Sequence, residues 1–358
     1  MTVEGRAVVI SARIGAGHDG AAGELTRRLS GLGFAVDRFD YLDLLPGRWG
    51  QRLCDAYHRE LEIAPASWDW LLAAMGHAPL AGLARAVSAL ALPNLRKVLA
   101  PAPRLVVSTY PLASQALGAL RRKGELDAPV AVYLTDPSVH RLVVSQHADL
   151  HIAPNDHAAA AVRRFGAPAT EVARPVVAPE FRPALPGERD RARRRFGLAT
   201  GERLALVVSG SWGVGEVEEI TADVTATGVA HPAVVCGRNE ALRERLTRAG
   251  VPRVFGWVRD MPALLRACDV VVQNAGGLST LEALATGVPV ITYRCLPGHG
   301  RANARVLDEI GLVPSVTGVA GLAQALSTAR PSGLPAGADP AGLLARLAGM
   351  RIPEVPAA

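Results

Sequence analysis

The sequence predicts an α/β protein with two doubly wound, parallel-sheet domains. Short apolar runs typical of buried strands alternate with helical patterns in two series along the 358 residues. Strands that are separated by helices form right-handed βαβ units, whose strands are parallel. Between the two series, prolines at four positions from Pro175 to Pro186 interrupt the pattern, which is typical of a connection between domains.

The first series begins with a predicted strand at Ala7–Ser11 and a helix from Asp19 to about Leu32. Its later strands are expected at Ala35–Phe39, Leu105–Ser108 and Val130–Leu134. The strands of the second series are expected at Leu204–Ser209, Ala233–Cys236, Arg253–Phe255, Val270–Gln273 and Val288–Tyr293. We therefore expect an N-terminal domain over 1–175, a linker over 176–200, a C-terminal domain over 201–330 and a tail over 331–358 with a final helix.

Composition restricts the class of protein. A hydrophobic content of 49% and a mean hydropathy of +0.19 fit packed globular domains, and the length allows two cores. No apolar run approaches the 18 or more residues of a membrane span, and the N-terminus shows no signal-peptide pattern, so we expect a cytoplasmic protein. The four cysteines lack Cys-x-x-Cys spacing, which argues against a zinc site or a disulfide framework.

The net charge of +6 raises the question whether the protein binds nucleic acid. The basic residues are spread along the chain, no nucleic-acid motif accompanies them, and the one dense cluster, Arg189–Arg195, lies in the predicted linker. We therefore expect no nucleic-acid partner. Binding to anionic lipid headgroups or to a nucleoside diphosphate explains the positive charge more simply.

The segment from Gly276 to Asn303 carries the densest functional pattern. Its Gly-Gly pair lets the backbone pass close to a ligand, and Ser279 is placed to cap a helix whose free N–H groups point at a diphosphate. One turn later, the carboxylate of Glu282 can accept hydrogen bonds from two ribose hydroxyls. The same residues also fit a capping box, Ser-x-x-Glu, that serves the helix alone.

The N-terminal loop fits two kinds of site. The Gly-x-Gly-x-x-Gly pattern from Gly15 to Gly20 follows a predicted strand as in a dinucleotide fingerprint, with Asp37 or Asp40 near the distance of a ribose carboxylate. An NAD-dependent dehydrogenase therefore stays open. His18 lies at the start of a helix whose positive end favours the neutral imidazole, so it can serve as a general base; a capping or positioning role is the alternative.

Together these two motifs resemble the GT-B glycosyltransferases. The pattern Gly-Gly-x-Ser/Thr-x-x-Glu-Ala, followed by Gly-x-Pro and Pro-Gly-x-x-x-x-Asn, is similar to their donor site, and Val8–His18 is similar to their opening strand and Gly-x-Gly-His loop. Relatives of this kind are the monogalactosyldiacylglycerol synthases, the processive diacylglycerol glucosyltransferases and the family 28 N-acetylglucosaminyltransferase that makes lipid II. The resemblance covers about Arg6 to Leu312. It implies two Rossmann-like domains facing a cleft, with a tail that crosses back to the first.

The resemblance also implies roles for individual residues. In the first domain it makes His18 the base, and Asp136, in Thr135-Asp136-Pro137, a partner or second base; a turn residue before proline is the alternative for Asp136. In the second domain, a Gly-rich turn holds phosphate oxygens, and backbone groups near Val258 read uracil. The expected donor-binding residues are Gly17, Ser211, Trp212, Gly213, Trp257, Val258, Gly277, Leu278, Ser279, Glu282, His299 and Asn303.

Some positions depart from the relatives. Trp212 is bulkier than their usual residue, and His299-Gly300 replaces their Gln-Glu, which leaves the sugar open. Tyr57, Trp68 and Trp70 are similar to their aromatic acceptor segment. The apolar spacing from Leu80 to Ala91 fits either a monotopic membrane helix or a core-facing one. Their Trp after Thr-Asp is missing, which keeps a soluble acceptor open.

We therefore expect an inverting transferase that moves a hexose or hexosamine from a UDP-sugar to a hydroxyl of a lipid or other lipophilic acceptor. The sequence has no Asp-x-Asp motif, so we expect neither a metal nor any cofactor besides the UDP-sugar co-substrate. We expect the protein in the cytoplasm, either free or peripheral at the inner face of the membrane. The alternatives are a natural-product glycosyltransferase with a soluble acceptor, a UDP-sugar 2-epimerase, an NAD-dependent dehydrogenase and a non-catalytic sugar-nucleotide sensor.

Overall fold

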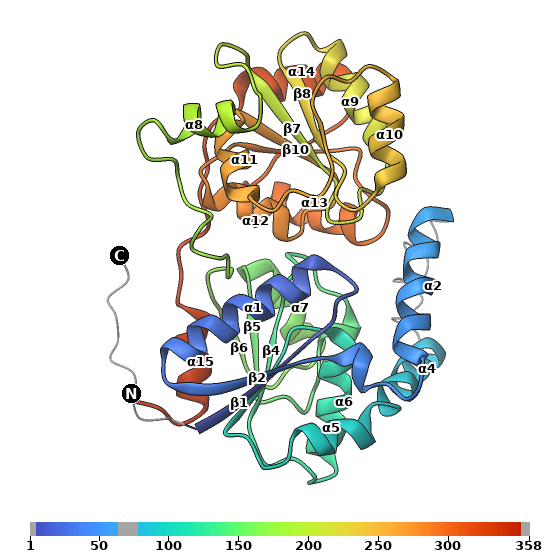
Figure 1. The fold of residues 1–358 in the computed structure, drawn as a ribbon. Coiled ribbons are helices and arrows are strands. Elements are labelled where there is room, and N and C mark those ends of the chain that lie inside the picture. Colours follow the sequence, from blue (N-terminus) through green and yellow to red (C-terminus); the bar gives the residue numbers. More distant parts are fainter. Residues whose placement is uncertain (1–4, 64–77, 352–358) are drawn as a thin grey trace. The chain divides into compact units, whose positions relative to one another are not determined.

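The computed structural model describes residues 5–63 and 78–351, and the chain divides into two compact units. Unit 1 contains the chain up to Val176 and again from Pro335, and unit 2 is Val177–Leu334 (Figure 1). Nearly all of the predicted linker over 176–200 thus belongs to unit 2. It includes α8, Glu188–Arg195, because the buried Arg193 donates to the carbonyl of Ala267 at 2.8 Å and pairs with Asp269 at 2.8 Å.

Unit 1 is built on a six-stranded parallel sheet in the order β2-β1-β3-β4-β5-β6. In the register, Val9 of β1 lies opposite Arg38 of β2 and Val107 of β3. The strands are β1 Gly5–Ser11, β2 Phe34–Asp40, β3 Leu105–Ser108, β4 Val130–Tyr133, β5 Leu150–Ala153 and β6 Thr170–Val172. The helices and 3-10 turns are α1 Ala16–Gly31, η1 Tyr41–Leu44, α2 Trp49–Ile63, α4 Ala78–Ala89, α5 Leu92–Val98, α6 Pro111–Arg122, η2 Arg141–Val143, α7 Asp156–Arg164 and α15 Pro340–Leu347.

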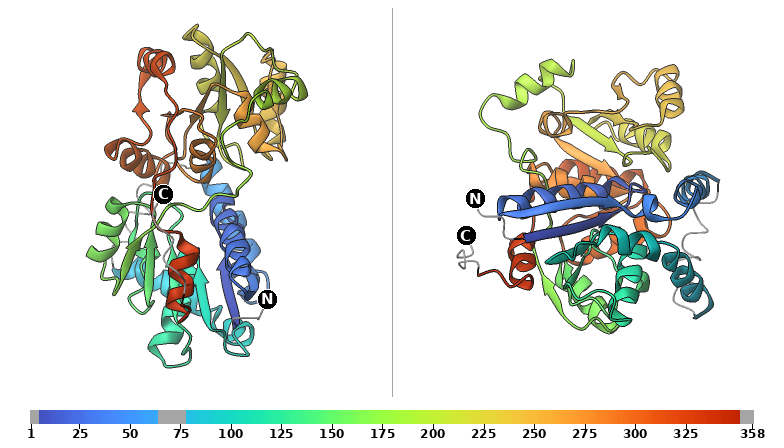
Figure 2. Two further views of the ribbon diagram at one scale, coloured as in Figure 1. Left: turned by 90° about the vertical axis from the view of Figure 1, so that its left-hand side faces the viewer. Right: turned by 60° about the horizontal axis from the view of Figure 1, so that its bottom comes forward.

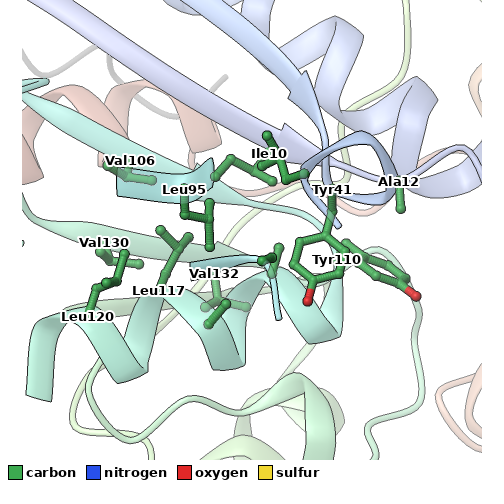
Figure 3. Packing of buried hydrophobic residues seen from close by; sticks show 14 of the residues in the cluster. Ile10, Ala12, Tyr41, Leu95, Val106, Tyr110, Leu117, Leu120, Val130 and Val132 are labelled. Atoms are coloured by element: carbon green, nitrogen blue, oxygen red, sulfur yellow. The ribbon is translucent and has the colours of Figure 1, made fainter. Parts of the chain in front are cut away.

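Both faces of this sheet are covered, because its central strands are apolar on both sides. On one face, Val106, Val130 and Val132 point toward Leu117 and Leu120 of α6 (Figure 3). On the other face, alternate strand residues pack against α1 and α15. This two-sided burial explains why the strands read as continuous apolar runs.

Helix α15 returns to unit 1 after the chain has passed through unit 2 and lies beside the sheet of unit 1 in both views of Figure 2. Arg28 of α1 pairs with Asp339 at 2.8 Å, and Leu344 and Ala345 are buried in the core with the strands. The C-terminal segment is therefore part of the packed core of unit 1.

Unit 2 has a second six-stranded parallel sheet, in the order β12-β11-β10-β7-β8-β9. Helices α11, α12 and α13 cover one face, and α9, α10 and α14 cover the other. The strands are β7 Leu204–Val208, β8 His231–Val235, β9 Val254–Phe255, β10 Val270–Gln273, β11 Val290–Tyr293 and β12 Ser315–Val316. The helices after α8 are α9 Val217–Ala226, α10 Glu240–Arg248, α11 Met261–Ala267, α12 Leu278–Ala285, α13 His299–Glu309 and α14 Gly318–Thr328.

The predicted fold class is confirmed, and each predicted strand is present within one or two residues at either end. Three strands were missed. β5 carries the buried polar His151, while β6 and β12 are short edge strands of three and two residues with little apolar signal.

Candidate active site

The strand order of unit 2 makes the ends of β7 and β10 a candidate ligand site. The chain winds from β7 through β8 to β9 on one side, and then β10 lies on the other side of β7. Ligands of doubly wound sheets bind outside the carboxyl ends of the strands at such a reversal. The two turns that meet here are joined by a hydrogen bond from the Asn274 side-chain amide to the carbonyl of Val214, at 2.9 Å.

The turn after β7 contains Ser211, Trp212 and Gly213, and its backbone requires glycine. Gly210, Gly213 and Gly215 have φ values of 66°, 54° and 96°. A Cβ on Gly213 would lie 2.3 Å from the carbonyl oxygen of Cys236. The glycines thus permit a tight turn packed on the end of β8, with room for a ligand to approach the backbone.

The turn after β10 is held by Gln273, which the sequence analysis did not identify. Its buried side-chain oxygen accepts from the N–H groups of Ala275, at 2.7 Å, and Gly276, at 2.5 Å. Asn303, predicted to bind the donor, is 2% exposed, and its amide donates to the carbonyl of Ala275 at 3.3 Å. In this structure Asn303 therefore supports the Gly-Gly turn.

The prediction that Ser279 caps the following helix is wrong. Gly276 has φ 72° and Gly277 is the N-cap residue, so α12 begins at Leu278 and Ser279 already lies inside its first turn. The capping-box interpretation fails for the same reason, because Glu282 is five residues past the cap and cannot reach back to it. No side chain caps α12. Its first-turn N–H groups keep the partial positive charge that attracts a phosphate.

Glu282 lies on α12 with an unusual electrostatic state. Its side chain keeps partial exposure, yet desolvation by the surrounding protein raises the pKa of the carboxyl to about 8. Among the described residues, no hydrogen bond or ion pair to its carboxyl is found. A desolvated carboxyl without a protein partner, on a helix at the strand-order reversal, is typical of a ligand-binding group.

Trp212, which follows β7, and Trp257, which follows β9, both lie close to one cation. The Arg238 guanidinium is 4.6 Å from the ring centroid of Trp257 and 5.6 Å from that of Trp212. Trp257 is 52% exposed, so it does not lie in the core. Val258, the next residue, packs against the core of unit 2. Arg238, a residue not identified from the sequence, thus brings a positive charge next to two indole rings, groups that can interact with an aromatic base.

His299 is the first residue of α13, whose N-cap residue Gly298 has φ 71°. A Cβ on the next residue, Gly300, would lie 3.0 Å from the carbonyl oxygen of Asn274. The first turn of α13 therefore lies directly against the Gly-Gly turn.

In unit 1 the strand order reverses between β1 and β3, and His18 lies at that point. It is in the first turn of α1, one residue after Gly17. Its Nδ1 is 2.6 Å from the carbonyl oxygen of Thr109, the residue after β3. Because a carbonyl only accepts, Nδ1 carries the proton in the neutral ring and Nε2 keeps its lone pair.

Asp136 connects with His18 through Thr135. The Thr135 hydroxyl oxygen is 3.1 Å from Nδ1 of His18 and donates to the Asp136 carboxyl at 3.3 Å. A positive charge that forms on the imidazole is therefore linked to a carboxylate by one hydroxyl. Thr109 and Thr135 complete this arrangement, and neither was predicted as a site residue.

The two carboxylates of the dinucleotide hypothesis are engaged elsewhere. Asp37 pairs with Arg6 at 2.6 Å, and Asp40 accepts from the N–H of Leu42 at 2.8 Å and pairs with Arg13. These contacts count against a ribose acceptor at the end of β2.

Comparison with known proteins agrees with this geometry. Residues 214–329 match the family model described as glycosyl transferases group 1. The processive diacylglycerol beta-glucosyltransferase of Bacillus thuringiensis (strain Al Hakam) is 28% identical over 215 residues, which cover 58% of this chain and 55% of that protein. Anabaena Alr3699/HepE, solved with UDP-glucose, has a TM-score of 0.56 at 16% identity over 91% of this chain and 89% of that one. Acinetobacter baumannii MurG has a TM-score of 0.53 at 16% identity, with 96% and 93% covered.

The chain has the GT-B fold and is similar to glycosyltransferases. The predicted resemblance is thereby confirmed. The chain spans about half the length of the curated relatives that it matches, 55%. At 16% identity the solved structures establish the GT-B fold alone.

Several predictions about this GT-B chain concern acceptor binding. Trp68 and Trp70 lie outside the described residues, and Tyr57 lies on α2, where the structure does not describe its side chain. Helix α4 packs against α6.

None of the helices that the structure describes combines the length and apolar character needed to cross a bilayer. Within residues 5–63 and 78–351, no group of three or more His, Cys, Asp or Glu side chains that could hold a metal is found.

Proposed function

We propose that this protein is an inverting glycosyltransferase that moves a hexose or hexosamine from a UDP-sugar to a hydroxyl of a lipid or other lipophilic acceptor. The observation that carries the proposal is the start of α12 in unit 2. There an uncapped helix N-terminus follows a Gly-Gly turn at the strand-order reversal, with the desolvated and unpartnered Glu282 carboxyl on the same helix.

In this proposal unit 2 binds the donor. The N–H groups at the start of α12 and in the turn after β7 donate hydrogen bonds to the diphosphate, Glu282 accepts from the ribose hydroxyls, and Trp257 and Trp212 hold the base. As the bond between the sugar and the diphosphate breaks, negative charge grows on the leaving oxygen. The positive end of α12 stabilises that charge without reorganising, because its dipoles are already oriented.

Unit 1 supplies the base. Nε2 of His18 takes the proton of the acceptor hydroxyl as its oxygen attacks the anomeric carbon from the face opposite the diphosphate, which inverts the configuration. The resulting imidazolium is stabilised through Nδ1 by the carbonyl of Thr109 and, through Thr135, by Asp136. The lipid nature of the acceptor is inferred from the diacylglycerol glucosyltransferase similarity.

The test is a calorimetric titration of the full chain with UDP, GDP, dTDP and NAD, followed by assays with UDP-sugars and diacylglycerol. We expect UDP to bind most tightly and radiolabelled sugar to appear in the lipid fraction. UDP-sugar conversion without an acceptor would indicate an epimerase instead. Preferential NAD binding would contradict the proposal.

Replacing Trp257 by alanine is expected to weaken UDP binding about tenfold, because stacking of a base on an aromatic side chain contributes roughly 1–3 kcal/mol. Trp257→Phe should keep most of the affinity. The matched control is Trp49→Ala on unit 1, since Trp49 is 51% exposed and also has an arginine over its ring. Equal UDP affinities in Trp257→Ala and the wild type would remove Trp257 from the site.

A further inference from the structure

Arg294, the first residue after β11, has an unusual backbone conformation. Its φ is +47°, and it is the only non-glycine residue in the described part of the chain with a positive φ. This left-handed region is unfavourable for residues with a Cβ, and it persists where surrounding contacts impose it. Such strain tends to lie at functional sites.

Two carboxylates from one helix hold Arg294 in this conformation. Its Nε donates to the Asp223 carboxyl at 2.8 Å, and the guanidinium also pairs with Glu216. The hydroxyl of Tyr293 donates to the same Asp223 oxygen at 2.9 Å. Asp223 lies within α9 and Glu216 is its N-cap residue, so these contacts, which we call the Arg294 clamp, bind the end of β11 to α9.

The clamped loop, residues 294–298, lies against the turns after β7 and β10. The N–H of Leu296 donates to the carbonyl of Asn274 at 2.8 Å. A Cβ on Gly215, the residue before Glu216, would lie 2.7 Å from the Leu296 side chain. The loop then leads into α13 through Gly298, and its conformation therefore sets the position of His299.

We propose that Arg294 is a positioning residue that fixes the loop carrying His299 against the sugar of the donor and so sets sugar preference. The inference rests on the proposed function, since it assumes a UDP-sugar at the start of α12. A purely structural ion pair would not require a strained backbone at the entry to this loop. The clamp also joins the loop to the turn after β7. The groups that contact the phosphate of the donor and those that contact its sugar therefore keep a fixed position relative to each other.

The test uses Arg294→Gly, which accepts the left-handed backbone without strain and removes the clamp. We expect UDP affinity within about twofold of the wild type, a KM for the preferred UDP-sugar about five- to tenfold higher, and weaker discrimination among UDP-glucose, UDP-galactose and UDP-N-acetylglucosamine. Arg294→Lys should restore part of the discrimination. The matched control is Arg245→Ala, which breaks another arginine pair to α9, with Glu218 at 3.0 Å, and should change neither quantity.

Glu216→Gln provides a second variant, because Glu216 is 58% exposed and its replacement opens one half of the clamp at the surface. It should shift the KM and the sugar preference in the same direction as Arg294→Gly does, but by a smaller amount. Unchanged KM and unchanged sugar preference in folded Arg294→Gly or Glu216→Gln would overturn the inference while leaving the proposed function intact. Absence of UDP binding and sugar transfer in the wild type would instead overturn the proposed function.

Discussion

Replacing His18 by alanine is expected to lower the turnover of sugar transfer by roughly 10²–10⁴-fold while UDP affinity stays unchanged. The reason is that His18 is bonded through Nδ1 to the carbonyl of Thr109, which leaves Nε2 as the proton acceptor. The donor groups in unit 2 do not involve this side chain. The measurement is the initial rate of transfer at saturating UDP-sugar, with UDP affinity determined by calorimetry on the same preparation.

Two variants sharpen this experiment. His147→Ala replaces an exposed histidine of the same unit and should leave the rate unchanged. Thr135→Val removes the hydroxyl that links His18 to Asp136 and should reduce turnover by less than His18→Ala does. If His18→Ala transfers sugar at the wild-type rate, His18 is not the base and a non-catalytic role for the N-terminal loop follows.

Glu282→Gln is expected to weaken UDP binding by about 10- to 100-fold, because hydrogen bonds to a charged group contribute roughly 1.5–3 kcal/mol each. Glutamine keeps the shape of the side chain, so the loss of UDP affinity measures the contribution of the negative charge. Calorimetry of both proteins with UDP measures it. Equal affinities would show that the ribose does not contact this carboxyl.

The raised pKa of Glu282, about 8, predicts how binding depends on pH. Below pH 8 the free carboxyl holds its proton, and ribose hydroxyls bind best to the carboxylate. Binding therefore releases a proton, and UDP affinity rises as the pH approaches 8. The number of protons released on binding is measured by calorimetry with UDP at pH 7 in buffers of different ionisation enthalpy. Subtracting the number measured for Glu282→Gln removes the protons that UDP itself releases.

The same raised pKa affects stability in a defined direction. The folded protein holds this proton more tightly than the unfolded chain, whose ordinary value is 4.5. Its contribution to stability is therefore complete below pH 4.5 and is lost as the pH rises through 8. Glu282→Gln should consequently melt higher than the wild type at pH 8 and gain less at pH 5. Thermal denaturation at both pH values tests this, and an equal difference at both would contradict a desolvated, protonated Glu282.

The fold could be predicted from the sequence because its information is local. Buried parallel strands are continuous apolar runs, and the alternation of such runs with helical patterns determines a doubly wound sheet whatever the details of packing. The strands that escaped prediction are those whose pattern carries little apolar signal, such as β6 and β12 at the sheet edges. Likewise, the glycine patterns identified both turns at the carboxyl ends of the strands in unit 2.

The sequence by itself thus determined the two sheets, the resemblance to glycosyltransferases and the neighbourhood of Glu282 and His18. Only the tertiary structure decided how each group is held. It placed the start of α12 at Gly277, because backbone dihedrals around Gly276 rather than the Ser-x-x-Glu pattern set where helical geometry begins. It brought Arg238 close to two tryptophans that follow different strands, joined His18 to Thr109 across 91 residues, and clamped Arg294 to α9. Such contacts depend on which distant strand ends become neighbours in the sheet, and no local spacing encodes that.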